Sequence, residues 1–134
     1  MQKLNNILKG VEYSGLADSR NISGVFYDSR KIKKDSLFIA IKGFNVDGHK
    51  YIDKAIELGA NSILLDQHIE NKYSIPFLKV KNSRKAMSQI ASNFFGDYSK
   101  HISITGVTGT NGKTSITHLI NYILKFNNYA TSSL

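Results

Sequence analysis

Apolar positions cluster into short runs along the first 80 residues, and each run has the length of one strand. Residues 36–41 (Ser-Leu-Phe-Ile-Ala-Ile) are almost continuously apolar, which is typical of a strand buried on both faces of a sheet. Residues 22–27, 62–65 and 77–80 form three more runs that predict further strands. Gly43, Asn45 and the Asp47-Gly48 pair predict a loop between residues 42 and 50.

A second set of apolar residues recurs with the three- and four-residue spacing of helices. It predicts a helix near the N-terminus, another after residue 51 and a third after residue 82; the residues are Leu4, Ile7 and Leu8, then Ile52, Ala55 and Ile56, then Met87, Ile90, Ala91 and Phe94. We expect Asn82 or Ser83 to cap the third helix and Gly96 to end it, as Gly59 ends the second. Because strands alternate with helices, the sequence predicts the α/β class.

A glycine-containing loop near residue 110 carries the clearest chemistry of the chain. Apolar residues 102–105 predict a strand before it, and periodic apolar positions from 115 to 126 predict a helix after it. The loop itself reads Gly109, Thr110, Asn111, Gly112, Lys113 and Thr114. Glycines let successive backbone N–H groups point at a phosphate, and the helix start adds the positive end of its dipole. Lys113 can reach the outer phosphates and the Thr114 hydroxyl can bind Mg²⁺, so the loop predicts an ATP site.

The spacing of this loop departs from the standard phosphate-binding pattern at one position. The pattern wants a glycine six places before the lysine, where this chain has Val107, and Gly106 stands one place too early. The Gly-x-x-Gly-Lys-Thr core and its strand–loop–helix context are intact. A nucleotide site is therefore favoured over a chance loop of this composition.

The distribution of charge and the length of the chain predict two parts. All 10 acidic residues lie in residues 1–98, whereas residues 99–134 contain three lysines and no Asp or Glu. We predict a domain at 1–98, large enough to fold alone, and a single strand–loop–helix unit at 99–134 that needs neighbours. ATPases with such loops normally supply a carboxylate for Mg²⁺ from a later strand. We therefore expect the chain to be an N-terminal piece of a longer enzyme.

Composition disfavours several classes of partner. The net charge is +8, but the basic residues are dispersed and form no nucleic-acid-binding motif, so a solvated basic surface is favoured over a nucleic acid partner. No apolar run approaches the ~20 residues of a membrane span. The chain has no cysteine, which rules out disulfides and thiolate metal sites and favours a cytoplasmic setting. The four histidines show no metal-ligand spacing, and surface or supporting roles are expected for them.

Two loops of the first part allow either a structural or a binding interpretation. Asp28-Ser29-Arg30 is explained as a turn in which short polar side chains bond to their own backbone, although a serine and an arginine at a strand end also suit a phosphate or a uracil. Residues 43–48 form either a tight loop or a base-binding loop, in which Phe44 stacks and Asn45 hydrogen-bonds. The residues alone leave both alternatives open for each loop.

Taken together, these segments resemble the Mur ligase family. The similarity runs in order through Asp28-Ser29-Arg30, residues 35–40 (Asp-Ser-Leu-Phe-Ile-Ala), Lys42-Gly43, Asp47-Gly48-His49, residues 55–60 (Ala-Ile-Glu-Leu-Gly-Ala) and residues 105–114. It covers residues from about 22 to 126 and is far more specific than a phosphate-binding loop alone. The resemblance implies a small UDP-binding domain, with a mixed sheet and flanking helices, followed by the start of a parallel-sheet ATPase domain.

The resemblance also implies roles for individual residues. The family uses ATP to phosphorylate the carboxylate of a UDP-muramoyl-peptide, and an amine then attacks the acyl phosphate. By resemblance, the UDP end would be contacted by Tyr27, Ser29 and the triplet Phe44-Asn45-Val46, where the family often has His-Gln-Ala instead. The ATP loop would extend from Gly109 to Ser115, with Lys113 and Thr114 as catalytic residues and Thr114 as part of a Mg²⁺ site.

Within the family, the chain most resembles the branch that adds the third amino acid to UDP-MurNAc-L-Ala-D-Glu. The implied partners are this UDP-dipeptide, an amino acid and the missing remainder of the ligase, and we do not expect the chain to complete the reaction alone. The alternatives are the branch that acts next in the pathway and a non-catalytic UDP-sugar-binding module. A folylpolyglutamate synthase is disfavoured because it lacks the domain that carries the Asp-Ser-Arg segment.

Overall fold

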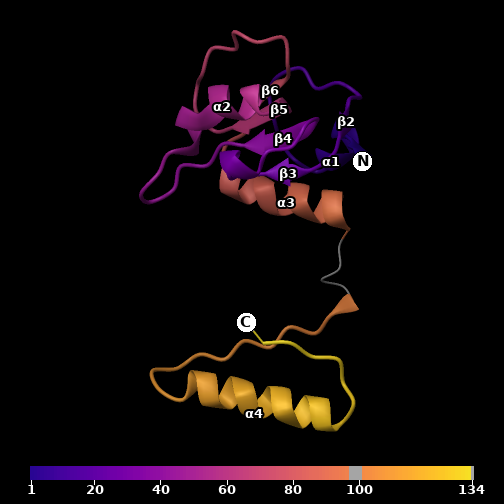
Figure 1. Ribbon diagram of the computed structural model, residues 1–134, viewed down its shortest axis with the longest axis vertical. Coiled ribbons are helices and arrows are strands. Elements are labelled where there is room, and N and C mark those ends of the chain that lie inside the picture. Colours follow the sequence, from indigo (N-terminus) through magenta and orange to yellow (C-terminus); the bar gives the residue numbers. More distant parts are fainter. Residues whose placement is uncertain (97–100, 134) are drawn as a thin grey trace. The chain divides into compact units, whose positions relative to one another are not determined.

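The computed structural model describes residues 1–96 and 101–133 (Figure 1). Contacts within the chain group it into two compact units, Met1–Tyr98 and Ser99–Leu134. The predicted domain boundary between residues 98 and 99 falls in the segment 97–100, which lies outside the described residues. In the described part of the chain, no helix is both long enough and apolar enough to cross a membrane.

A four-stranded parallel sheet forms the centre of the first unit. Its strands are β3 (Val25–Phe26), β4 (Ser36–Ile39), β5 (Ala60–Leu65) and β6 (Phe77–Lys79), and they lie in the order β3-β4-β5-β6. Every residue of β4 is buried, and so is every residue of β5 except Asn61. This burial explains the almost continuous apolar runs, because both faces of the sheet are covered. The predicted α/β class is confirmed.

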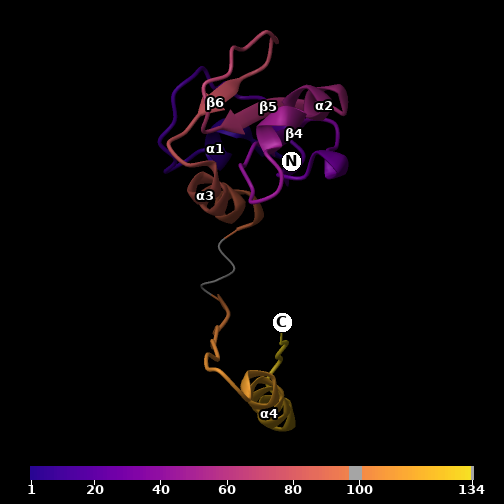
Figure 2. The same ribbon diagram turned by 90° about the vertical axis from the view of Figure 1, so that its left-hand side faces the viewer.

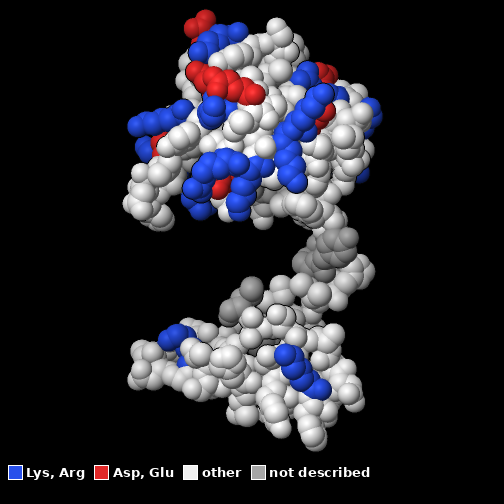
Figure 3. All heavy atoms as spheres, viewed as in Figure 1, with Lys and Arg blue, Asp and Glu red and all other residues white. Residues whose placement is uncertain are grey.

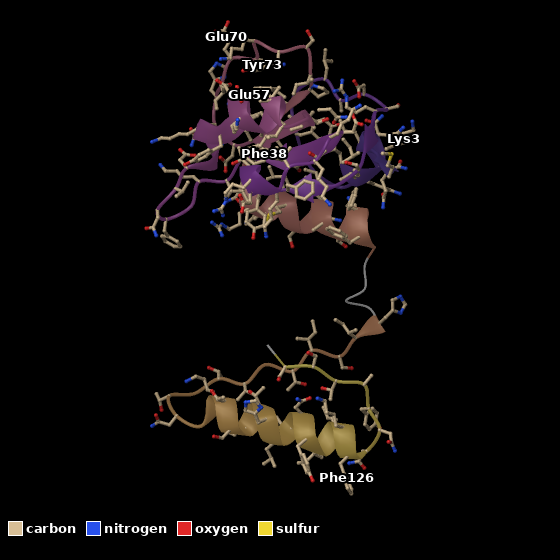
Figure 4. The ribbon with its side chains drawn as sticks, in the orientation of Figure 1. Lys3, Phe38, Glu57, Glu70, Tyr73 and Phe126 are labelled. Carbon is tan, nitrogen blue, oxygen red and sulfur yellow. The ribbon has the colours of Figure 1, made fainter. Side chains whose placement is uncertain are left out.

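Helices lie on both faces of this sheet (Figures 1 and 2). On one face, α1 (Leu4–Ile7) and α3 (Ser83–Phe95) pack against Leu37 and Ile39 of β4. On the other face, α2 (Ile52–Glu57) packs in a second core with Phe38, which is fully buried within the first unit (Figure 4). Successive residues of β4 therefore enter opposite cores, as the two-residue period of a strand requires.

The segment from 21 to 26 contains two short strands where the sequence predicted one. β2 (Asn21–Ile22) pairs antiparallel with β1 (Gln2–Lys3) in a separate sheet, whereas β3 pairs with β4. The prediction of one strand at 22–27 is therefore wrong, and the chain changes sheet at Ser23 and Gly24. Between the two strands, the Ser23 backbone N–H donates to the carbonyl of Asp35, the residue before β4, at 2.7 Å. The expected N-terminal helix is confirmed, although it spans only Leu4–Ile7.

The predicted ends of α3 and the predicted stop after α2 are confirmed. Asn82 is the N-cap of α3, and its side-chain oxygen accepts a hydrogen bond from the Lys85 backbone N–H at 2.9 Å. Gly96 follows the helix with φ of +91°. Gly59 has φ of +107° just beyond α2, a backbone conformation that glycine adopts without steric cost.

The second unit contains one α-helix, α4 (Lys113–Phe126), among its described residues 101–133. The predicted helix at 115–126 is thus confirmed and begins two residues earlier. The predicted strand at 102–105 is wrong, because residues 103–108 have no regular secondary structure. A strand needs a partner for its peptide groups, and the described part of this unit holds no other strand. The apolar side chains of this segment, Ile102 and Ile104, are exposed.

Candidate functional site

The carboxyl ends of β3, β4 and β5 meet at one edge of the parallel sheet, and two of the loops that follow carry the predicted UDP-binding residues. Tyr27 and Ser29 follow β3 directly, and residues 44–46 follow β4. Since β3 and β4 are neighbours in the sheet, the structure places the two groups on adjacent loops. Open α/β sheets bind their ligands at this edge.

The loop after β3 is ordered by Asp28. Its carboxylate accepts hydrogen bonds from Nε of Arg30 at 2.9 Å and from the Arg30 backbone N–H at 3.0 Å, and so starts the short helix η1 (Ser29–Lys31). These bonds from Arg30 lower the pKa of the Asp28 carboxyl to about 2. The turn interpretation therefore accounts for Asp28 and Arg30. Tyr27 is exposed and Ser29 half-buried, so both can meet a ligand from solvent.

Residues 41–48 form a narrow loop after β4 that we call the 41–48 hairpin. The Gly48 backbone N–H donates to the Ile41 carbonyl at 2.9 Å, and the Gly43 N–H donates to the Val46 carbonyl at 2.9 Å. A Cβ atom on Gly48 would lie 2.8 Å from the Ile41 carbonyl oxygen. The two arms thus approach so closely that only glycine fits at this position.

The tip of the 41–48 hairpin projects side chains into solvent. Phe44 is fully exposed, and Asn45 and Val46 are exposed as well. An exposed aromatic ring beside a carboxamide combines a stacking surface with hydrogen-bond donors and an acceptor. The tip therefore offers the two kinds of contact that a planar base requires.

A buried histidine lies at the base of this hairpin. The His49 ring, whose side chain is 4% exposed, places Nδ1 2.6 Å from Asp47 Oδ1 and Nε2 3.2 Å from Asp66 Oδ1. The second contact is an ion-pair distance that is not aligned as a hydrogen bond. Asp47 also accepts from Gln67 Nε2 at 3.3 Å, and Asp66 accepts from the Ser83 backbone N–H at 3.0 Å. Hydrogen bonds from His49 lower the pKa of Asp47 to about 2.

Several exposed basic residues belong to the same two loops. They are Arg30 and Lys31 in η1, Lys42 in the hairpin and Lys50 in the helix η2 (Gly48–Tyr51) that follows it. Basic side chains on adjacent loops attract phosphate groups. Figure 3 shows Lys and Arg intermixed with Asp and Glu over the first unit and no acidic atoms on the second, since residues 99–134 contain neither Asp nor Glu.

The predicted ATP loop, residues 109–115, runs into the first turn of α4, and all of its residues are exposed. Gly109 and Gly112 have φ of +147° and +75°, and Gly112 is the N-cap of the helix. The Lys113 ammonium folds back over the loop, where Nζ donates to the carbonyls of Gly109 at 2.6 Å and Thr110 at 3.1 Å. The loop backbone thus holds the lysine beside the first turn of α4, where helical N–H groups have no intrahelical acceptor.

Metal ligands are scarce around this loop. Thr114 and Ser115 are exposed in the first turn of α4, so the Thr114 hydroxyl is free to face an ion bound with a nucleotide. The described ranges 1–96 and 101–133 contain no group of three His, Cys, Asp or Glu side chains arranged to hold a metal ion. Thr114 thus offers a single oxygen toward the Mg²⁺ that the sequence predicts.

Comparison with known proteins identifies the family. The model described as "Mur ligase family, catalytic domain" matches residues 21–95, more than half of the chain. The chain belongs to the Mur ligase family. Among the curated Mur ligases, the UDP-N-acetylmuramoyl-L-alanyl-D-glutamate–2,6-diaminopimelate ligases of Clostridioides difficile and Clostridium tetani are each 47% identical to it, over 93% and 92% of the chain. The chain spans 26% of the length of each relative.

Solved Mur ligase structures share the fold. MurF from Acinetobacter baumannii superposes with a TM-score of 0.70 at 20% identity, over 93% of this chain and 28% of that enzyme. MurF from Thermotoga maritima, solved in complex with ADP, gives a TM-score of 0.56 at 28% identity, over 76% of this chain and 23% of that enzyme. The expected family and fold are therefore confirmed, whereas the roles of individual residues remain predictions.

Sequence reasoning missed part of this site. It included His49 in the Asp47-Gly48-His49 segment of the family resemblance but expected only a surface or supporting role for it, and it did not single out Asp66 or Gln67. His49 and Asp47 are close in sequence, so a local pair was detectable. Asp66 lies 17 residues further along and joins them only because β5 ends beside β4. The parallel order of the strands is the signal that would bring it in.

Proposed function

We propose that this chain is the N-terminal part of a Mur ligase of the MurE type, which uses ATP to join an amino acid to UDP-MurNAc-L-Ala-D-Glu. Support comes from eight curated relatives, 36–47% identical, whose names all give this UDP-dipeptide and 2,6-diaminopimelate. A MurF-type ligase is the alternative within the family. The solved MurF structures support the shared fold, but their sequences are less similar, at 20–28% identity.

The UDP end of the substrate binds at the carboxyl edge of the sheet. The observation that carries this proposal is the placement of Ser29 and the exposed hairpin tip on adjacent loops. Phe44 stacks on the uracil and Asn45 hydrogen-bonds to it, with Tyr27 and Val46 at its border. Ser29 and the basic residues of the two loops hold the diphosphate, whose negative charge they complement.

Titration calorimetry with UDP-MurNAc-L-Ala-D-Glu tests this site. We expect Ser29→Ala to raise the Kd of the 134-residue chain about tenfold, because a hydrogen bond to a charged group is worth about 1.5–3 kcal/mol. Ser88→Ala, an exposed position on α3, is the matched control and should leave the Kd unchanged. If the unmodified chain gives no binding heat, the proposed UDP site is refuted.

ATP binds to residues 109–115 through its phosphates, and three features of this loop suit phosphate binding. Two glycines with positive φ precede a helix start, and an ammonium group is already held beside it. Lys113 and the loop N–H groups neutralise charge on the γ-phosphoryl group while it moves to the substrate carboxylate. Mg²⁺ would supply positive charge that offsets the phosphates, and the Thr114 hydroxyl is the residue of this loop that would help to hold it. Residues 99–134 hold no carboxylate for the ion, so the remaining ligands come from elsewhere in the ligase.

Equilibrium dialysis with ATP and Mg²⁺ tests the loop. Lys113→Ala should weaken ATP binding at least tenfold, whereas Lys125→Ala, at the other end of α4, should not. Normal binding of the UDP ligand with no ATP binding by the unmodified chain would favour the alternative of a non-catalytic UDP-sugar-binding module. Rapid ATP-dependent ligation by the isolated chain would contradict the requirement for further residues.

A further inference from the structure

The 41–48 hairpin needs a device that fixes its direction. Its tip is exposed, and the backbone hydrogen bonds that join its two arms are those at Ile41–Gly48 and Gly43–Val46. An exposed phenylalanine at such a tip has no core to hold it in place. The orientation of the tip is therefore set where the hairpin joins the body of the unit, which is at Asp47 and His49.

His49 joins this base to a strand that is distant in sequence. Its Nδ1 contacts Asp47, which closes the hairpin, and its Nε2 faces Asp66, which follows β5. Asp66 is itself fixed by the Ser83 N–H at the start of α3. Each ring nitrogen therefore faces a carboxylate, Asp47 on one side and Asp66 on the other. The histidine thus bridges the hairpin to the rigid part of the sheet.

A purely packing role explains this arrangement poorly. Burying the polar His49 ring beside two half-buried carboxylates costs free energy that an aliphatic side chain of similar volume would avoid. The same ring nitrogens instead face acids on two separate loops, and Gln67 adds a third contact between those loops through Asp47. All of these contacts lie between the base of the 41–48 hairpin and the residues that follow β5.

We propose that His49 is a positioning residue that, by linking Asp47 to Asp66, holds the 41–48 hairpin in the orientation that meets the uridine end of a UDP-linked ligand. The inference rests on the proposed UDP site, whose ligand contacts lie at the tip. It assigns His49 no contact with the ligand. Its effect on binding passes through the hairpin.

A double-mutant cycle tests the link. His49→Asn keeps a donor at the position of Nδ1 and loses the reach to Asp66, and Asp66→Asn keeps the shape and the acceptor for Ser83. Each single change should raise the Kd for UDP-MurNAc-L-Ala-D-Glu about tenfold. The double variant should also be about tenfold weaker, because the same link is broken once. His68→Asn, at an exposed histidine in the loop after β5, is the control and should not change the Kd.

Amide hydrogen exchange separates positioning from a general loss of structure. If His49 holds the hairpin, both single variants should speed exchange at the Gly43 and Gly48 amides, which close it. The sheet amides of Ala40 and Ile63, which bond to Leu64 and Pro76, should keep their protection.

Each outcome of these experiments either supports or overturns the proposed role of His49. A non-additive tenfold loss together with local exchange at the hairpin supports the link. Unchanged affinity in both single variants, an additive hundredfold loss in the double variant, or uniform exchange across the sheet overturns it. If the unmodified chain binds no UDP ligand, the proposed function fails. Exchange at Gly43 and Gly48 then still decides the link, since a local increase supports it and none refutes it.

Discussion

Replacement of Gly48 by alanine should destabilise the first unit strongly, although the change adds only one methyl group. The new Cβ would lie 2.8 Å from the carbonyl oxygen and 2.9 Å from the nitrogen of Ile41, inside the 3.4–4 Å of ordinary contact. Ile41 cannot retreat easily, because it follows the buried end of β4, where the Ala40 N–H bonds to the Leu64 carbonyl at 2.8 Å. The arms of the hairpin must therefore separate.

The expected magnitude follows from two losses. Forcing extra volume against fixed atoms costs about 1–3 kcal/mol, and breaking the Gly48–Ile41 hydrogen bond costs about 0.5–1.5 kcal/mol. Together they lower the free energy of unfolding by about 2–4 kcal/mol, a large share of the ~5–15 kcal/mol of a typical domain. For a unit of this size the Tm should fall by about 10–25 °C.

Urea unfolding followed by far-UV circular dichroism measures this loss. Gly106→Ala is the control, because no atom lies within 4 Å of a Cβ built there and its φ is not positive. It should leave the unfolding midpoint of the first unit unchanged. If the free energy of unfolding of Gly48→Ala lies within about 0.5 kcal/mol of that of the unmodified chain, the reasoning is refuted. The Ile41 backbone would then have shifted at little cost to accommodate the methyl group.

Two further changes test the contacts around the site. Because hydrogen bonds from His49 lower the pKa of Asp47 from 3.8 to about 2, this carboxylate stabilises the fold above about pH 4, and the stabilisation disappears as the pH falls from about 4 to 2. In acid titrations Asp47→Asn should lose stability less steeply than the unmodified chain, and equal slopes would contradict the shift. Asn82→Ala removes the N-cap of α3 and should cost about 1 kcal/mol in urea unfolding, whereas Ser88→Ala should cost little; equal effects would argue against the cap.

The sequence predicted best those elements whose signals are local. The buried run at β4, the Asn82 cap and the glycine after α3 each depend on residues within one element, and the structure confirms all three. The loop between residues 42 and 50 was also predicted, because Gly43 and Gly48 lie only a few residues apart in the sequence and signal a turn locally. Local backbone chemistry therefore accounts for most of the secondary structure in the first unit.

Features that depend on pairing partners were not predictable in the same way. An apolar run at 22–27 indicates strand but does not say that Ile22 pairs with β1 while Val25 pairs with β4. Residues 102–105 have the same apolar character, yet the described residues of the second unit offer no strand to pair with. The bridge from His49 to Asp66 likewise depends on strand order. Long-range pairing, which single residues do not encode, explains each of these misses.

The edges of the parallel sheet carry a consequence for the behaviour of the chain in solution. At the β6 edge, Ser14 and Lys79 exchange two backbone hydrogen bonds of 2.8 Å, so the N-terminal segment occupies the peptide groups that another chain would otherwise pair with. At the opposite edge, β3 is two residues long and runs directly into the charged turn at Asp28. Short, blocked or charged edges resist strand addition between molecules. Removal of the segment that carries Ser14 would uncover β6 and make the unit more prone to edge-to-edge aggregation.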